Sequence, residues 1–168
     1  TYPFDDPNPI PLIGNIPNIY PYFKYDGYST SSINKDWKVV TIENDLIQVM
    51  ILPEAGGKVW GAIDKTTGEE FIYKNEVMKF RNISMRGPWT SGGIEFNFGI
   101  IGHHPSTATP VDYSYGNEPD GSAYCLVGSI DLPSRTQWRV KIVLKEGRAN
   151  FETQASWYNP TSYRQAYY

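Results

Sequence analysis

Cysteine and histidine are both scarce in this sequence of 168 residues. Cys125 is the single cysteine, which excludes an internal disulfide framework and any metal site built from cysteines. Basic residues are also few: 15 against 18 acidic residues leave a net charge of −3, so no nucleic-acid partner is expected. Runs of about 18 apolar residues, the length that crosses a bilayer, are missing as well, and we expect no membrane span.

Aromatic side chains and proline are plentiful instead. The chain has 13 tyrosines and 5 tryptophans, and such rings stack on the apolar faces of sugars and line binding grooves. Six of the 13 prolines fall within residues 1–34, where they forbid a long helix and favour extended chain. Residues 1–34 are therefore expected to form an extended N-terminal arm on the surface of the fold.

Residues 35–168 show the pattern of one antiparallel β domain. The β-branched runs "WKVVTIEN" and "DLIQVMILP" are separated by a turn signal at Asn44 and Asp45. In "TQWRVKIVLK" every second residue from Trp138 onward is apolar, as in a strand with one buried face. No segment shows a helical period, so we predict an all-β fold, an antiparallel β-sandwich. The aromatic ending "WYNPTSYRQAYY" predicts a sandwich truncated at its C-terminus, or a final edge strand.

The stretch "RGPWTSGGIEFNFGIIGHHPSTATP", from Arg86 to Pro110, concentrates polar side chains among glycines and prolines. If "GGIEFNFG" is a strand, its three large apolar side chains share one face, and Glu95 and Asn97 share the other. A carboxylate beside an amide suits a sugar, because the two groups together accept and donate hydrogen bonds to hydroxyls. The alternatives are that Glu95 faces solvent on an amphipathic strand or pairs with Arg86.

His103 and His104 stand in the loop sequence "GHHP". Imidazole gives and takes a proton near neutral pH, so both are candidate catalytic residues together with Glu95. Adjacent residues in extended chain point in opposite directions, and at most one of the two is expected to face a given pocket. The alternative is a pair of loop histidines that make local hydrogen bonds.

Arg86 and Trp89 are candidate substrate-binding residues with Asn97. The planar guanidinium group of Arg86 could hold a pair of sugar hydroxyls, or it could form a structural salt bridge. Trp89 lies in a loop of glycine and proline, which favours a stacking platform over a core position. Trp60 alternates with Val59 in an expected strand, and we predict that it belongs to the core.

Neither a cofactor nor a metal is predicted. The paired glycines of "TSGGIE" and "EAGGKV" lack the Lys-Ser/Thr that follows a phosphate-binding loop. No His-x-x-x-His or comparable ligand set is present in the sequence. The sequence leaves a calcium site open, because four residues with oxygen donors lie near expected loops: Asp112, Glu118, Asp120 and Asp131. Their spacing is not that of a calcium-binding loop.

Three segments carry a resemblance to a known family: "ILPEAGGKVWGAIDKTTGEEFIY", "KFRNISMRGPWTSGGIEFNFGIIGHHPSTATPVDY" and "SRTQWRV". They resemble an uncharacterised bacterial domain family of the galactose-mutarotase-like class, often followed by tetratricopeptide repeats in longer, exported chains. The resemblance covers Tyr20 to Tyr168. It implies the N-terminal half of a β-supersandwich with a concave sheet that faces sugar. A periplasmic or secreted location is implied too.

The resemblance also implies roles for single residues. In mutarotase-like enzymes a histidine protonates the sugar ring oxygen while a carboxylate takes the proton of the anomeric hydroxyl. The family pattern holds a histidine after glycine at His103, which makes this residue the first choice for the acid. Glu95 is the candidate base. The implied partners are a carbohydrate and either the missing C-terminal part of the same protein or a second copy of the chain.

Two functions follow as hypotheses. The first is a carbohydrate-recognising domain of a carbohydrate-active protein, an epimerase, glycoside hydrolase or lyase that uses general acid–base chemistry. The second is a non-catalytic carbohydrate-binding or structural domain of a larger exported protein. The position of Glu95 relative to the two histidines discriminates between them, because an acid–base pair requires side chains within about 5–6 Å of each other.

Overall fold

The computed structural model of the chain describes residues 31–82, 88–98, 103–131 and 134–165. These residues form nine strands and one short 3₁₀ helix. The elements are β1 (Val40–Glu43), β2 (Ile47–Leu52), β3 (Lys58–Asp64), β4 (Phe80–Asn82), β5 (Pro88–Thr90), the 3₁₀ helix η2 (Pro105–Ala108), β6 (Asp112–Asn117), β7 (Ala123–Asp131), β8 (Thr136–Leu144) and β9 (Phe151–Tyr158).

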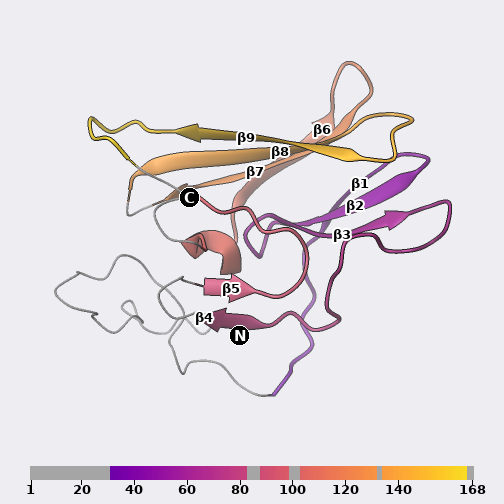
Figure 1. The fold of residues 1–168 in the computed structure, drawn as a ribbon, viewed down its shortest axis with the longest axis horizontal. Coiled ribbons are helices and arrows are strands. Elements are labelled where there is room, and N and C mark those ends of the chain that lie inside the picture. Colours follow the sequence, from indigo (N-terminus) through magenta and orange to yellow (C-terminus); the bar gives the residue numbers. More distant parts are fainter. Residues whose placement is uncertain (1–30, 83–87, 99–102, 132–133, 166–168) are drawn as a thin grey trace.

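The strands form two main antiparallel sheets that pack face to face. The first has the order β1-β2-β3 and the second has the order β6-β7-β8-β9. A separate two-stranded ribbon, β4-β5, lies below the two sheets in the view of Figure 1, with η2 next to β5. The arrangement confirms the prediction of an all-β antiparallel sandwich. In the described part of the chain, no helix is long and apolar enough to cross a membrane.

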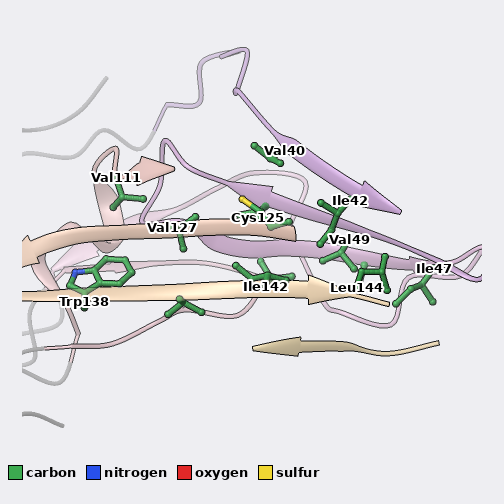
Figure 2. Packing of buried hydrophobic residues seen from close by; sticks show 14 of the residues in the cluster. Val40, Ile42, Ile47, Val49, Val111, Cys125, Val127, Trp138, Ile142 and Leu144 are labelled. Carbon is green, nitrogen blue, oxygen red and sulfur yellow. The ribbon is translucent and has the colours of Figure 1, made fainter. Parts of the chain in front are cut away.

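The core between the sheets follows from alternation along the strands. On β8 the side chains of Trp138, Val140, Ile142 and Leu144 are all buried, whereas Arg139 between them is exposed. Figure 2 shows residues of β7 and β8 facing those of β1 and β2 across the space between the layers. Burial of one such side chain contributes about 1.5–3 kcal/mol, so this shared face holds the two sheets together.

The β1-β2-β3 sheet contains an irregularity in β3. The register with β2 shifts between Met50 and Ile51, which leaves Trp60 as an extra residue on β3. Val59 and Ala62 are three positions apart and would face opposite ways in a regular strand, yet both are completely buried in the core. The extra residue in β3 allows the side chains of both Val59 and Ala62 to face the core. Trp60 is half-buried and outside the core cluster, contrary to the core position expected for it.

Two other expectations have different outcomes. The predicted strand "GGIEFNFG" is absent: among the described residues the segment makes only one isolated bridge, between Ile94 and Val59. Residues 1–30 of the expected N-terminal arm lie outside the described residues, so the boundary between arm and domain stays a prediction.

Candidate functional site

The site begins with a turn that only glycine can make. Gly92 and Gly93 both have left-handed backbones, with φ of 74° and 70°. A Cβ atom at Gly93 would lie 2.3 Å from the carbonyl oxygen of Val59, so a side chain has no room there. The close approach lets Ile94 and Val59 exchange two backbone hydrogen bonds of 2.8 and 3.2 Å. The turn therefore fixes the segment after Gly93 against β3.

Beyond this turn the side chains divide as the sequence predicts, although the segment is not a strand. Phe98 is buried and stacks on Trp138 with ring centroids 4.9 Å apart, and Ile94 and Phe96 also pack against the core. The two polar side chains meet the histidine segment instead. Glu95 contacts the side chain of His103, and Asn97 Oδ1 accepts a hydrogen bond of 3.0 Å from the backbone N–H of His104.

Glu95 and His103 form a hydrogen-bonded pair. Oε1 of Glu95 lies 2.8 Å from Nδ1 of His103. Because a carboxylate can only accept, Nδ1 carries the proton and donates it. In the neutral imidazole, Nε2 then has a lone pair that can accept a proton from a ligand. The side chains are 13% and 23% exposed, so the pair is shielded while keeping contact with solvent.

His104 has a different environment. Its side chain is 1% exposed, and its ring meets that of Trp138 edge-on at 5.3 Å. Nδ1 accepts a 3.0 Å hydrogen bond from the backbone N–H of Ser106, so in the neutral ring Nε2 carries the proton and lies 3.7 Å from Oδ1 of Asp131. Burial lowers the pKa of His104 to about 4, although the nearby charge of Asp131 acts in the opposite direction. The geometry makes His104 the N-cap of η2, away from solvent.

Lys58 was not identified from the sequence, and its buried side chain bonds Thr90 and Ser91, directly before the Gly-Gly turn. The side chain is 1% exposed. Its Nζ donates hydrogen bonds to Thr90 Oγ1 at 2.8 Å and to the carbonyl oxygens of Thr90 and Ser91 at 3.3 and 3.4 Å. Burial lowers the pKa of Lys58 to about 8, and the charge of Glu95 opposes this shift. The available signal was a lysine directly after Gly-Gly in an otherwise apolar strand.

A hollow of about 570 Å³ is lined in part by the Gly-Gly turn, Gly92 and Gly93. Three aromatic residues line it: Trp89 is partly buried, whereas Phe71 and Tyr73 are 46% and 77% exposed. Polar groups in its wall come from Asn75, Lys79 and Ser91.

Backbone contacts hold the two walls of the hollow together. Gly93 N–H donates to the Tyr73 carbonyl at 2.8 Å, and Ser91 N–H donates to the Lys79 carbonyl at 2.9 Å. The hydroxyl of Ser91 also accepts from the backbone N–H of Lys79 at 2.8 Å. The hollow is therefore formed by two segments of the chain that are tied at both ends, and its shape does not depend on one loop.

The predicted site residues thus fall into two neighbouring features. Glu95, Asn97, His103 and His104 come together as one cluster, in which His103 alone pairs with Glu95. Trp89 lies in the hollow, which Glu95 and His103 do not line. The segment from Trp89 to Glu95 connects both features. Arg86 lies outside the described residues. No three His, Cys, Asp or Glu residues gather as a metal site within the described ranges.

Comparisons with known proteins agree with the architecture. Residues 14–168 match a family described as a domain of unknown function, DUF5107. The chain is also similar to the crystal structure of a TPR-domain containing protein from Parabacteroides distasonis ATCC 8503, with 26% sequence identity and a TM-score of 0.71. The similarity covers 79% of this chain and 23% of that one. This chain therefore corresponds to about a quarter of the length of its longer relative.

Proposed function

The chain belongs to the DUF5107 family, and we propose that it is a carbohydrate-recognising domain. The observation that carries the proposal is the hollow, which gathers Phe71, Tyr73 and Trp89 around one opening. A pyranose ring has an apolar face of C–H groups, which packs well on an aromatic ring, and a rim of hydroxyls that need polar partners. Binding pockets for small molecules combine the same two elements in volumes of about 300–1,000 Å³.

The polar wall of the hollow supplies partners for such hydroxyls. The side-chain amide of Asn75 donates a 3.2 Å hydrogen bond to the hydroxyl oxygen of Tyr73. This contact leaves the O–H of Tyr73 to donate and the Oδ1 of Asn75 to accept. Lys79 adds a cation at the same wall. A sugar seated on Trp89 would therefore find a donor and an acceptor in reach of its edge.

We also propose that the domain is mutarotase-like and works outside the cytoplasm as part of a larger exported protein. The antiparallel sandwich supports the mutarotase-like part of this proposal. The length of the TPR-domain relative, of which this chain covers 23%, supports the part about a larger protein. The rest of such a protein, or a second copy of the chain, is the proposed partner that completes the site. Fractionation of cells that express the full-length protein tests the location.

Calorimetry against a panel of mono- and oligosaccharides tests the binding function. Tyr73→Ala and Trp89→Ala are expected to weaken sugar binding at least tenfold, because each removes a stacking surface of the hollow. Tyr158→Ala is the matched control, since Tyr158 is an exposed tyrosine on β9 outside the hollow. If the folded wild-type chain binds no sugar, the hollow is a structural feature and the domain serves interaction within a larger protein.

Acid–base catalysis on a sugar that extends from the hollow to the neighbouring Glu95–His103 pair is a second candidate, favoured by the 2.8 Å contact within that pair. In contrast to the roles implied by the resemblance, His103 would be the base here: its unprotonated Nε2 would take a proton from a sugar hydroxyl. Glu95, which accepts from Nδ1, would stabilise the imidazolium that forms. Turnover assays for epimerisation, hydrolysis and elimination separate this from binding alone. His103→Ala should abolish turnover and leave sugar affinity nearly unchanged, whereas a loss of affinity alone would assign His103 to binding.

A further inference from the structure

The aromatic hollow has a cationic wall. Of the described residues that line it, Lys79 is the one that carries a charge. We propose that the sugar bound there is anionic: a pyranose with a carboxylate or sulfate group, which the ammonium group of Lys79 holds while the apolar face of the ring packs on Trp89. This proposal rests on the carbohydrate function proposed above and narrows it to one chemical class of sugar.

The backbone places Lys79 beside Trp89. In the ribbon, Phe80 of β4 is paired with Thr90 of β5. The pairing continues one step further, because the Ser91 N–H donates to the Lys79 carbonyl at 2.9 Å and the Lys79 N–H donates to Ser91 Oγ at 2.8 Å. Lys79 is therefore opposite Ser91 and diagonal to Trp89, and all three line the hollow from the same face of the ribbon. A diagonal neighbour is within reach of a long side chain, so the cation can meet a ligand that stacks on Trp89.

The charge of Lys79 is available to a ligand. Its side chain is exposed, and within the described part of the chain no carboxylate forms an ion pair with it. Glu70, in the segment that leads to the hollow, is paired with Lys74. Glu76, three positions before Lys79, is exposed and does not line the hollow. An anionic ligand would thus meet a cation that no protein carboxylate already neutralises.

The neutral groups of the wall are rich in donors. The O–H of Tyr73 is left to donate, since its oxygen accepts from Asn75. The N–H of Gly92 has no acceptor among the described residues. The hydroxyl of Ser91 is already used by backbone groups, one as donor and one as acceptor. A carboxylate or a sulfate accepts hydrogen bonds and donates none, so it matches such a wall, whereas the hydroxyls of a neutral sugar also need acceptors.

The alternative is that Lys79 is an ordinary exposed lysine with no effect on the choice of ligand. The whole chain has a net charge of −3, so its overall field does not attract anions. A preference for an anionic sugar would therefore have to come from a local cation. Binding measurements with sugars that differ only in charge distinguish the two cases.

NMR titrations of the ¹⁵N-labelled chain with matched sugars make this test. The probes are methyl glycosides of the gluco, galacto and manno series, each with its uronic acid, its neutral uronamide and a sulfated form. In at least one series the uronic acid or the sulfated sugar is expected to bind about tenfold more tightly than the neutral forms, the effect of one charge-assisted hydrogen bond. The two anions tell recognition of a carboxylate from recognition of sulfate. At about 0.5 M salt the difference should shrink, because the site is exposed.

Variants assign the preference to one residue. Lys79→Met should bring the affinity for the anionic sugar down to that for its neutral counterpart, and Lys79→Arg should keep most of the preference. Because the Lys79 side chain is exposed, the Met variant is expected to fold. Lys38→Met is the matched control: it makes the same change in net charge at an exposed lysine outside the hollow, and it should retain the wild-type preference.

Equal affinities for the anionic and neutral forms in every series that binds would overturn this specificity and leave the carbohydrate function standing. A preference that persists in Lys79→Met would overturn it as well, and the salt and uronamide measurements on the wild type need no variant. If no sugar of any charge binds the folded chain, the carbohydrate function fails, and the anionic specificity fails with it.

Discussion

His103 and His104 are adjacent in the chain, yet their imidazole rings occupy two different environments. The ring of His103 meets Glu95 and keeps contact with solvent, whereas the ring of His104 is enclosed against Trp138. Extended backbone at His104, with φ of −64° and ψ of 135°, turns the two side chains apart. One histidine is therefore suited to exchange protons with a ligand, and the other is part of the packed interior.

This difference predicts selective chemical modification. Diethyl pyrocarbonate reacts with an unprotonated, accessible imidazole nitrogen, so His103 should react at neutral pH and His104 should stay protected while the chain is folded. Tandem mass spectrometry of the peptide that carries both histidines, followed over a time course, gives both rates from one sample. In denaturant the two rates should converge. Equal rates in the folded chain would contradict the burial of His104.

A second prediction concerns stability at acidic pH. The pKa of His104 is lowered to about 4 in the folded chain, against 6.5 for an ordinary histidine. Between these two pH values the unfolded chain binds more protons than the folded chain, so the free energy of unfolding rises with pH. The stability that the neutral His104 contributes is therefore lost as the pH falls from about 6.5 to 4. The contribution of this group is roughly 3 kcal/mol.

Urea unfolding of wild type and His104→Asn across that pH range measures the effect. Asparagine can still cap η2 by accepting from the Ser106 N–H, but it does not titrate. The difference in unfolding free energy between the two proteins should therefore change with pH, since carboxylates that do not contact His104 contribute equally to both and cancel. A constant difference from pH 4 to 6.5 would show that His104 is not buried as a neutral ring.

A third prediction compares two glycines with nearly the same backbone. Gly93 has φ of 70° and Gly68 has φ of 77°, so alanine costs about 1–2 kcal/mol at either position from the left-handed conformation alone. A Cβ at Gly93 also meets the Val59 carbonyl at 2.3 Å, whereas a Cβ at Gly68 meets nothing within 4 Å. Gly93→Ala should be destabilising by more than about 3 kcal/mol or fail to fold. Similar unfolding midpoints for the two variants would contradict the close approach.

The sheets could be predicted from the sequence because their signals are local. The alternation that starts at Trp138, and the turn at Asn44, depend on neighbours along the chain and reappear as β8 and as the β1–β2 hairpin. Trp60 was misplaced because a bulge is decided by what lies across the sheet. Its half-buried position could not be read from alternation alone.

The site was predictable only as a set of residue types. The apolar side of the segment after Gly93, and the polar side with Glu95 and Asn97, follow from alternation and appear in the structure. The contact of Glu95 with His103 depends on the course of the chain between them. Lys58 is far away in sequence, and only the Val59–Ile94 bridge, a tertiary contact that no local pattern indicates, brings its strand beside the segment of Glu95.

The last prediction concerns Lys58 at alkaline pH. Its pKa in the folded chain is lowered to about 8 from 10.5, mainly by burial. Between these values the unfolded chain holds the proton more tightly, so the free energy of unfolding contributed by Lys58 rises with pH, by up to roughly 3 kcal/mol. Lys58→Met lacks this increment, and its stability relative to wild type should fall between pH 8 and 10.5. Tyrosines, common to both proteins, cancel in the comparison.

Glu95→Gln extends this experiment, because the carboxylate opposes the shift of Lys58. Removing its charge takes away the interaction that favours the protonated lysine, so the rise in stability should begin at a lower pH than in the wild type. Urea titrations at half-unit pH steps resolve the midpoint of the rise. A midpoint unchanged by Glu95→Gln would mean that the two groups do not interact, and that the buried lysine is held by Thr90 and Ser91 alone.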